Sequence, residues 1–393
     1  MELAIELRMN IDPDDSPWLL HLSVREKEER RRAFWYSYRA YSIVQNLTAS
    51  PRKLPIWVQT VKYPSQVYDP HPIYLNADHP LRSQLWNLIG SIKQHWAVPP
   101  PNLIDLFSSA LESDLLTQLT QLQASANLDH LLLFENPLST TDSDISRFIS
   151  QTLASQSELC GMNLTYQSAI TVFYRPLLFA TALPSCKPDR LSDPHRTLII
   201  NVINQCLEAT WRVYTLFRFI DFMSLGEGRN LVSEDEVSLF YIYEISRCDA
   251  FEGIIVFWFI ACRMDPAWLG YLQSWDWVSN FSSQEFRKTM GRMLGWYFEE
   301  SRRNGFDLAI AEAMSGMLEE MEEVSRTGIR RGIHDRAKCE SVLAEITNAV
   351  SSIPSSSKEP RCFMGLLGMD IGKRGGWKSR TEESWRLFWK LNS

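Results

Sequence analysis

The sequence predicts an all-α fold, a single multihelical body joined by irregular, proline-rich loops. Long stretches place apolar residues at the three- and four-residue spacing of a helix, whereas the alternation of a half-buried strand is almost absent. Capping boxes, in which a serine and a glutamate three residues later satisfy free amides at a helix start, stand at Ser23 and Ser233. Hydrophobic residues make up 45% of the 393 residues, so a sizeable core is available.

The first capping box opens a predicted helix over 23–47. Two apolar stripes run along this stretch, which predicts burial against more than one neighbour. In its first turns Arg25 and Glu29, and two further pairs of opposite charge, stand four residues apart, so we expect this end to be solvated. Several prolines then predict an irregular segment over 51–80, because proline fixes φ and cannot donate a hydrogen bond.

The remaining helices are expected where apolar periodicity resumes between clusters of proline, glycine and serine. Their predicted ranges are 81–96, 103–123, 144–158, 163–182, 194–224, 233–263, 282–304, 306–327 and 335–352. Residues 1–350 are thus predicted to form the body of the protein. Residues 351–393 form a Ser/Pro- and Gly-rich linker and a basic tail, a composition typical of disordered segments, with a short helix predicted from Thr381.

The composition argues against direct binding of nucleic acid, zinc or membrane. The net charge is −7, so the chain lacks the basic field that binds phosphate. Its seven cysteines include no Cys-x-x-Cys pair, which indicates free thiols in a reducing compartment rather than a structural zinc site. The N-terminus carries charges where a signal peptide is apolar, and the most apolar run, 253–262, covers about half of a bilayer-spanning helix. We therefore expect a soluble intracellular protein.

The helix over 23–47 and its surroundings resemble the signature of a known family. The residues that carry the resemblance are, in order, Arg30, Arg31, Arg32, Phe34, Trp35, Pro51, Pro64, Arg175 and Pro176. An arginine triplet, an aromatic pair, two prolines and a later Arg-Pro in this order resemble the fungal-specific transcription factor domain. That domain is the middle homology region of zinc binuclear-cluster regulators of the xylanolytic-activator type. The sequence departs from the family pattern at Tyr41, where relatives commonly have Asp, and at Ala49 and Ser50, which replace Gly-Arg.

The resemblance implies an all-α regulatory domain of a nuclear protein that regulates RNA polymerase II transcription and is not an enzyme. It begins at the first residue, so we expect the earlier helices of the domain and the zinc-cluster head to be missing. Zinc belongs to that head in relatives, and no cofactor is expected in this chain. The implied partners are DNA, contacted only through the head, transcriptional co-regulators, a second copy of the chain and a small-molecule effector.

Two alternatives to a regulatory domain remain open. One is a headless interaction module that does not bind DNA directly. The other, more distant, is an all-α enzyme of the terpenoid-cyclase type. An apolar effector would need an aromatic-lined interior, for which the candidates are Trp211, Tyr214, Phe217, Phe240, Phe257 and Trp258.

The arginine triplet also has a plain structural interpretation. Three successive residues span about 200° of a helix, so they cannot all face one ligand. We expect one or two of them to brace neighbouring elements through carboxylate or carbonyl oxygens, with the rest solvated and the aromatic pair in the core. Glu26, Glu28 and Glu29 offset the local positive charge, which argues against a nucleic-acid role.

Other motifs that could carry chemistry are weak. The acidic run Asp12-Pro-Asp-Asp15 is the tightest carboxylate cluster, but its prolines predict a turn rather than a metal site on a helix. The four glutamates within 319–323 predict a solvated helix face. No histidine pair has zincin spacing and no Gly-x-Ser-x-Gly occurs, so the sequence offers no catalytic or metal-binding candidate.

Overall fold

The computed structural model describes residues 2–46, 61–62, 64, 80–96, 103–125, 143, 147, 158–224, 252–272, 290–291, 294–295 and 305–328. Over these ranges the chain forms helices and turns without a strand, which confirms the predicted all-α fold. The helices are α1 (Glu2–Glu6), α2 (Val24–Asn46), α4 (Pro80–His95), α5 (Leu103–Glu112), α6 (Leu115–Ser125), α8 (Glu158–Ala180), α9 (Asp193–Ser224), α13 (Gly305–Thr327) and a helix over 252–262. Short 3₁₀ turns are η1 (Pro13–Asp15), η2 (Pro17–Leu19), η6 (Pro184–Cys186), η7 (Pro188–Arg190) and η9 (Pro266–Tyr271).

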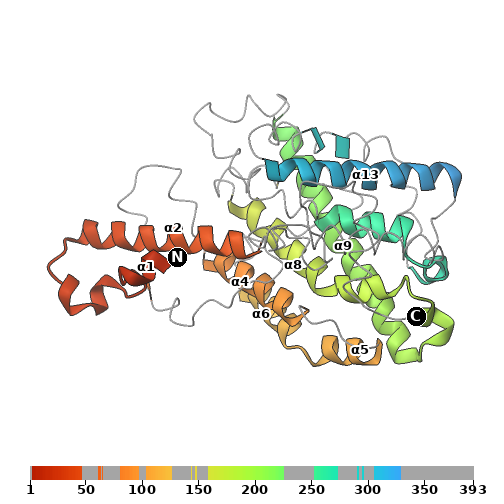
Figure 1. Ribbon diagram of the computed structural model, residues 1–393, viewed down its shortest axis with the longest axis horizontal. Helices are drawn as coiled ribbons and strands as arrows, with labels where there is room; N and C mark the ends of the chain where they lie inside the picture. The colour runs from red at the N-terminus through yellow and green to blue at the C-terminus, as the bar shows by residue number, and fades with distance from the viewer. Residues whose placement is uncertain are drawn as a thin grey trace, which may run out of the picture.

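The helices form one continuous packing arrangement. Figure 1 shows α1 and the beginning of α2 at one end of the molecule and α13 toward the other. α2 packs against α4, and α4 packs against both α6 and α8, while α8 and α9 form the most extensive helix pair. Nearly all described side chains of α8 are buried, as expected of a helix that is covered on all sides.

Two hydrophobic clusters hold these elements together. The larger one unites α4, α5, α6, α8, α9, the helix over 252–262 and α13. The smaller one consists of Phe34, Trp35, Tyr38 and Val61, with Met9 packed against it. Asn87 of α4 donates a hydrogen bond to the Tyr38 hydroxyl, which joins the smaller cluster to the body.

The start of α2 is fixed by the predicted capping box. The Ser23 amide donates to Glu26 Oε2 at 2.8 Å, and the Glu26 amide donates to Ser23 Oγ at 3.3 Å, so both halves of the box form. Arg25 and Glu29 pair on the exposed surface at 3.0 Å, as the spacing predicted.

The predicted helix over 103–123 was wrong in one respect, because it is divided into α5 and α6. Ser113 Oγ accepts from the Leu115 amide at 3.2 Å. Asp114 accepts twice from Gln118, at its carbonyl oxygen from the amide and at Oδ2 from Nε2, at 2.9 and 2.8 Å. The Ser113 side chain thus accepts from a free amide at the start of α6, and the Asp114 carbonyl accepts the first backbone hydrogen bond of that helix. The apolar periodicity continues across the break, so the pattern alone did not reveal it.

Most other predicted ranges that fall on described residues agree to within a few positions. α8 starts at Glu158 rather than at residue 163, and α4, α9 and α13 begin within one residue of the predicted starts. The predictions for 51–60, 144–146, 148–157, 233–251, 282–289 and 329–393 lie outside the described residues. The division into a body and a tail near residue 350 lies there too.

Candidate functional site

The central residue of the arginine triplet is bound to the acidic turn near the N-terminus. Arg31 of α2 donates from Nε to Asp12 Oδ2 at 3.0 Å and from Nη2 to Asp12 Oδ1 at 2.7 Å. Their side chains are 7% and 0% exposed. This parallel, two-point contact uses the forked guanidinium in a way that lysine cannot reproduce.

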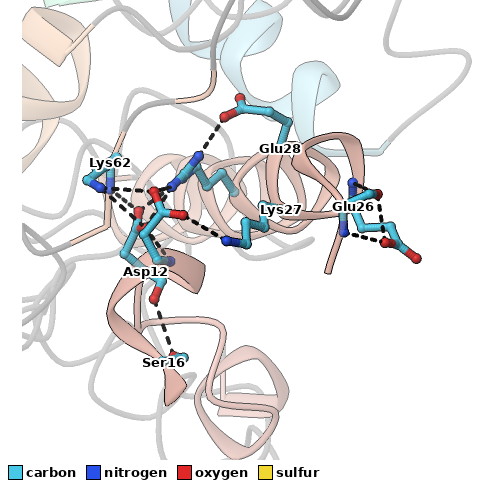
Figure 2. A network of polar contacts seen from close by, with 9 residues as sticks. Asp12, Ser16, Glu26, Lys27, Glu28 and Lys62 are labelled. Carbon is cyan, nitrogen blue, oxygen red and sulfur yellow. Dashed lines mark hydrogen bonds and ion pairs between the residues drawn. The ribbon is translucent and has the colours of Figure 1, made fainter. Parts of the chain in front are cut away.

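Further charges complete a compact network around this pair, drawn in Figure 2. Arg31 also reaches Asp14 Oδ2 through Nη2 and Glu28 Oε1 through Nη1, each at 2.6 Å. Two lysine ammonium groups bind Asp14, that of Lys27 at 3.1 Å and that of Lys62 at 3.0 Å. The N-terminal ion-pair network is therefore Asp12, Asp14, Lys27, Glu28, Arg31 and Lys62, with three charges of each sign.

Asp12 is the residue that connects the separate segments of this network. Its Oδ2 accepts from the Lys62 amide at 2.8 Å, and its Oδ1 accepts from the Asp14 amide at 3.0 Å. Its own carbonyl accepts from Ser16 Oγ at 3.2 Å (Figure 2). One buried carboxylate thereby joins the turn η1, helix α2 and the segment at residues 61–62.

The contacts within the network favour the charged forms of Asp12, Asp14 and Arg31. Burial alone would raise the pKa of Asp12, but the hydrogen bonds from Arg31 and from the Asp14 and Lys62 amides outweigh it and hold the pKa below its usual value. Lys62, Lys27 and Arg31 likewise hold the pKa of Asp14 far below its ordinary range. The pairing with Asp12 raises the pKa of Arg31. The carboxylates of Asp12 and Asp14 thus bind other groups of the same chain and hold the N-terminal segment in place.

The other two arginines of the triplet behave differently from Arg31. Arg30 donates from Nη2 to the Leu7 carbonyl at 2.6 Å, just after α1, and Arg32 is half-buried. Arg30 and Arg31 therefore both brace neighbouring elements, one through a carbonyl oxygen and the other through carboxylates. The expectation that this end of α2 is solvated was wrong for Glu28, which is buried because it faces Arg31.

The aromatic pair lies in the smaller hydrophobic cluster, as predicted. Phe34 and Trp35 are 0% and 3% exposed, and their ring centroids are 5.5 Å apart in an edge-to-face arrangement. Trp35 Nε1 donates to the Lys62 carbonyl at 3.0 Å, so the network and the cluster hold the same segment. Pro64 follows two residues later and is half-buried, whereas Pro51 lies outside the described residues.

The later Arg-Pro of the signature lies in α8, away from the N-terminal ion-pair network. Arg175 is 1% exposed and forms a buried ion pair with Glu252, which begins the described part of the helix over 252–262. Pro176 stands inside α8, where it cannot donate the usual helical hydrogen bond. The structure therefore divides the signature between two places, one at α2 and one in the central core.

A second buried charge cluster was missed at the sequence level. Glu320 of α13 accepts from Arg263 at Oε1 and Oε2 at 2.5 and 3.1 Å, and its Oε2 also accepts from Trp258 Nε1 at 2.9 Å. The Arg263 guanidinium lies 4.7 Å from the centre of the Trp258 ring. The prediction of a solvated glutamate run was wrong at Glu320. The available signal was that Glu320 falls on the apolar stripe that contains Met317 and Met321.

Three cysteines and one histidine of the described ranges are partly or fully buried. Cys186, Cys206 and Cys262 are buried free thiols, and burial raises the pKa of Cys186 to about 12. Burial lowers the pKa of His95, whose Nε2 is 3.1 Å from Ser109 Oγ. Five of the six predicted aromatic lining residues are buried in the larger cluster, and Phe240 lies outside the described residues. Three of them pack on one another, since the centroid of the Trp211 ring lies 5.2 Å from that of Tyr214 and 4.9 Å from that of Phe257.

Two features of a functional site are absent from the described ranges. They contain no group of three or more His, Cys, Asp or Glu side chains arranged to hold a metal ion. None of the helices in those ranges combines the length and apolar character needed to cross a membrane.

Comparison with known proteins leaves the chain without an assigned family. No family model matches it, and neither curated proteins nor solved structures give a match.

Proposed function

We propose that this chain is the helical regulatory region of a fungal zinc-cluster-type transcription factor, acting in the nucleus on RNA polymerase II transcription without enzymatic activity of its own. The observation that carries the proposal is the ordered signature in an all-α chain. An arginine triplet and an aromatic pair on one helix are followed by two prolines and then by an Arg-Pro in a later helix.

The contacts of Arg31, Trp35 and Arg175 support the proposal, because each of these signature side chains has a physical role. Arg31 supplies a forked donor for a buried carboxylate, and Trp35 supplies both apolar area and an indole donor for the Lys62 carbonyl. Arg175 is a buried charge in the core, and it pairs there with Glu252. Without such a counter-ion, burying the guanidinium would strongly destabilise the fold. These roles are structural. The signature residues would hold elements of the domain together, as the resemblance implies, rather than form a ligand-binding surface.

DNA contact would come from a zinc-cluster head and not from this region. The net charge of −7 gives no attraction for phosphate, and the two most buried arginines of the signature are committed to carboxylates. The partners of this region would accordingly be other proteins of the transcription machinery.

Chromatin immunoprecipitation of the tagged protein in its own host tests the proposal. We expect nuclear protein enriched at a defined set of promoters over an untagged control strain, and changed transcript levels for those genes on deletion. A nuclear protein that binds transcription proteins without promoter enrichment would favour the headless interaction module. Exclusion from the nucleus together with unchanged transcript levels would contradict both.

A further inference from the structure

The segment at residues 61–62 is held in place by side chains of other elements. Asp12 Oδ2 accepts from the Lys62 amide at 2.8 Å, and Trp35 Nε1 donates to the Lys62 carbonyl at 3.0 Å. Both main-chain groups of Lys62 are thus bound by side chains that lie 50 and 27 residues away in the sequence. Contacts of this kind hold a peptide backbone whatever its side chains are, so they provide affinity without sequence selection.

The two side chains of this segment make separate and different contacts. Val61 is 3% exposed and packs in the smaller hydrophobic cluster with the aromatic rings of α2. The Lys62 side chain is 57% exposed, and its ammonium lies 3.0 Å from Asp14 Oδ2 and 4.0 Å from Asp12 Oδ1 (Figure 2). The contacts therefore suit an apolar side chain followed by a cation.

The charges around Lys62 also favour a cation at this place. Without Lys62, the N-terminal ion-pair network consists of three carboxylates and the two cations Lys27 and Arg31. The Asp14 side chain is 40% exposed, so a cation from another molecule can reach it. An exposed ion pair stabilises a protein only slightly. The contact between Lys62 and Asp14 can therefore open while the buried pair of Arg31 and Asp12 stays formed.

We propose that η1 and α2 form a recognition site for a protein segment in which an aliphatic residue precedes a lysine. Val61 and Lys62 occupy this site in the same chain, and such a segment of a partner protein replaces them. The main-chain contacts, the apolar cluster and the exposed carboxylate match the three features of the segment. A tethered occupant has an advantage over a free one, so the site is mostly closed in the isolated chain. The inference does not depend on the proposed role in transcription.

Binding of a labelled synthetic peptide with the sequence of residues 59–65 to the full-length protein tests this site. In the protein, Val61→Asp combined with Lys62→Glu removes the occupant, because a carboxylate is unfavourable both in the apolar cluster and beside Asp14. The peptide should bind this double variant at least about tenfold more tightly than the wild type, of which only the open fraction is able to bind. Fluorescence anisotropy of the peptide measures both affinities.

Substitutions in the peptide are matched controls, because they leave the fold of the protein untouched. Val61→Asp or Lys62→Glu in the peptide should each abolish binding to the double variant. Adding Asp14→Asn to the double variant should weaken binding of the unaltered peptide, because Asp14 binds the lysine. Equal affinity for the wild type and the double variant, or binding of the altered peptides, would overturn the site. So would the absence of binding to a double variant whose circular dichroism equals that of the wild type.

Hydrogen–deuterium exchange of the wild-type protein decides the proposal even where the double variant does not fold. A large excess of the unaltered peptide should speed exchange at the main-chain amide of Lys62, because Asp12 then binds the amide of the peptide instead. The peptide with Lys62→Glu should leave that exchange rate unchanged. An exchange rate that is the same with and without the unaltered peptide would overturn the replacement of Val61 and Lys62.

Discussion

At the scale of single residues, Asp12 joins three segments of the chain through one carboxylate. Its carboxylate accepts from Arg31 and from two backbone amides, in a position that is fully buried. A buried ion pair stabilises a protein weakly against an apolar alternative, but removing one partner leaves an uncompensated charge. Asp12 and Arg31 are therefore expected to be sensitive to single substitution.

Asp12→Asn should destabilise the protein by about 3 kcal/mol at neutral pH, because the buried guanidinium loses its two-point partner. Asp15→Asn is the matched control, since Asp15 lies in the same turn and is exposed, and it should change stability by less than about 0.5 kcal/mol. Urea denaturation of the two variants and the wild type measures the difference. Equal stability of both variants would contradict the role assigned to Asp12.

The same contribution should depend on acid pH in a defined direction. The pKa of Asp12 is depressed in the folded state, so its contribution is complete above the unfolded value, about pH 4, and is lost as the pH falls through the folded value. The difference in unfolding free energy between the wild type and Asp12→Asn should therefore be constant from pH 7 to about pH 5 and shrink below about pH 4. A difference that grows on acidification would contradict this sign.

Glu320 offers a comparable test in the larger cluster. Glu320→Gln should cost about 3 kcal/mol, because Arg263 is left charged and buried without its counter-ion. Glu319→Gln, one residue earlier on the same helix and exposed, should change the unfolding free energy by less than about 0.5 kcal/mol. Combining Glu320→Gln with Arg263→Met should cost less than the sum of the two single changes. Additive costs would show that the two side chains do not act as a pair.

At the scale of whole elements, the C-terminal end of helix α13 depends on the backbone conformation of a single residue, Gly328. Gly328 has φ of +66°, and its amide donates to the Val324 carbonyl at 2.8 Å, which closes the helix with a left-handed residue. Gly328→Ala should therefore destabilise the protein by about 1 kcal/mol, although nothing lies within 4 Å of the added methyl group.

Gly270→Ala is the control for that substitution. Gly270 also has open space around an added methyl group, but its φ is not positive, so the change should be neutral or slightly stabilising. Thermal unfolding of both variants measures the effect. Equal melting temperatures would contradict the conformational explanation.

Among the described elements, most helices were predictable from the sequence and their long-range partners were not. The start of α2 followed from Ser23 and Glu26, which are three residues apart and therefore visible in the sequence. The pairing of Arg31 with Asp12 spans 19 residues, and no local pattern specifies it. Glu320 was hidden for a different reason, because four neighbouring glutamates suggested solvent although one of them falls on the apolar stripe.

For the whole molecule, the charge balance predicts the absence of direct DNA affinity. Purified protein at physiological salt should not bind a random-sequence duplex up to about 10 μM, because no excess of basic side chains releases counterions from the phosphates. Fluorescence anisotropy of a labelled duplex measures this. Binding that weakens steeply with added salt would contradict it.

A tethered reporter assay of the whole chain tests the proposed role in transcription most directly. The chain would be fused to an unrelated DNA-binding domain in a fungal reporter strain, with the DNA-binding domain alone and an Asp12→Asn fusion as controls. We predict that the wild-type fusion changes reporter transcription reproducibly and that Asp12→Asn weakens the effect at matched protein level. A folded, nuclear wild-type fusion that leaves the reporter at the level of the DNA-binding domain alone would contradict a regulatory role.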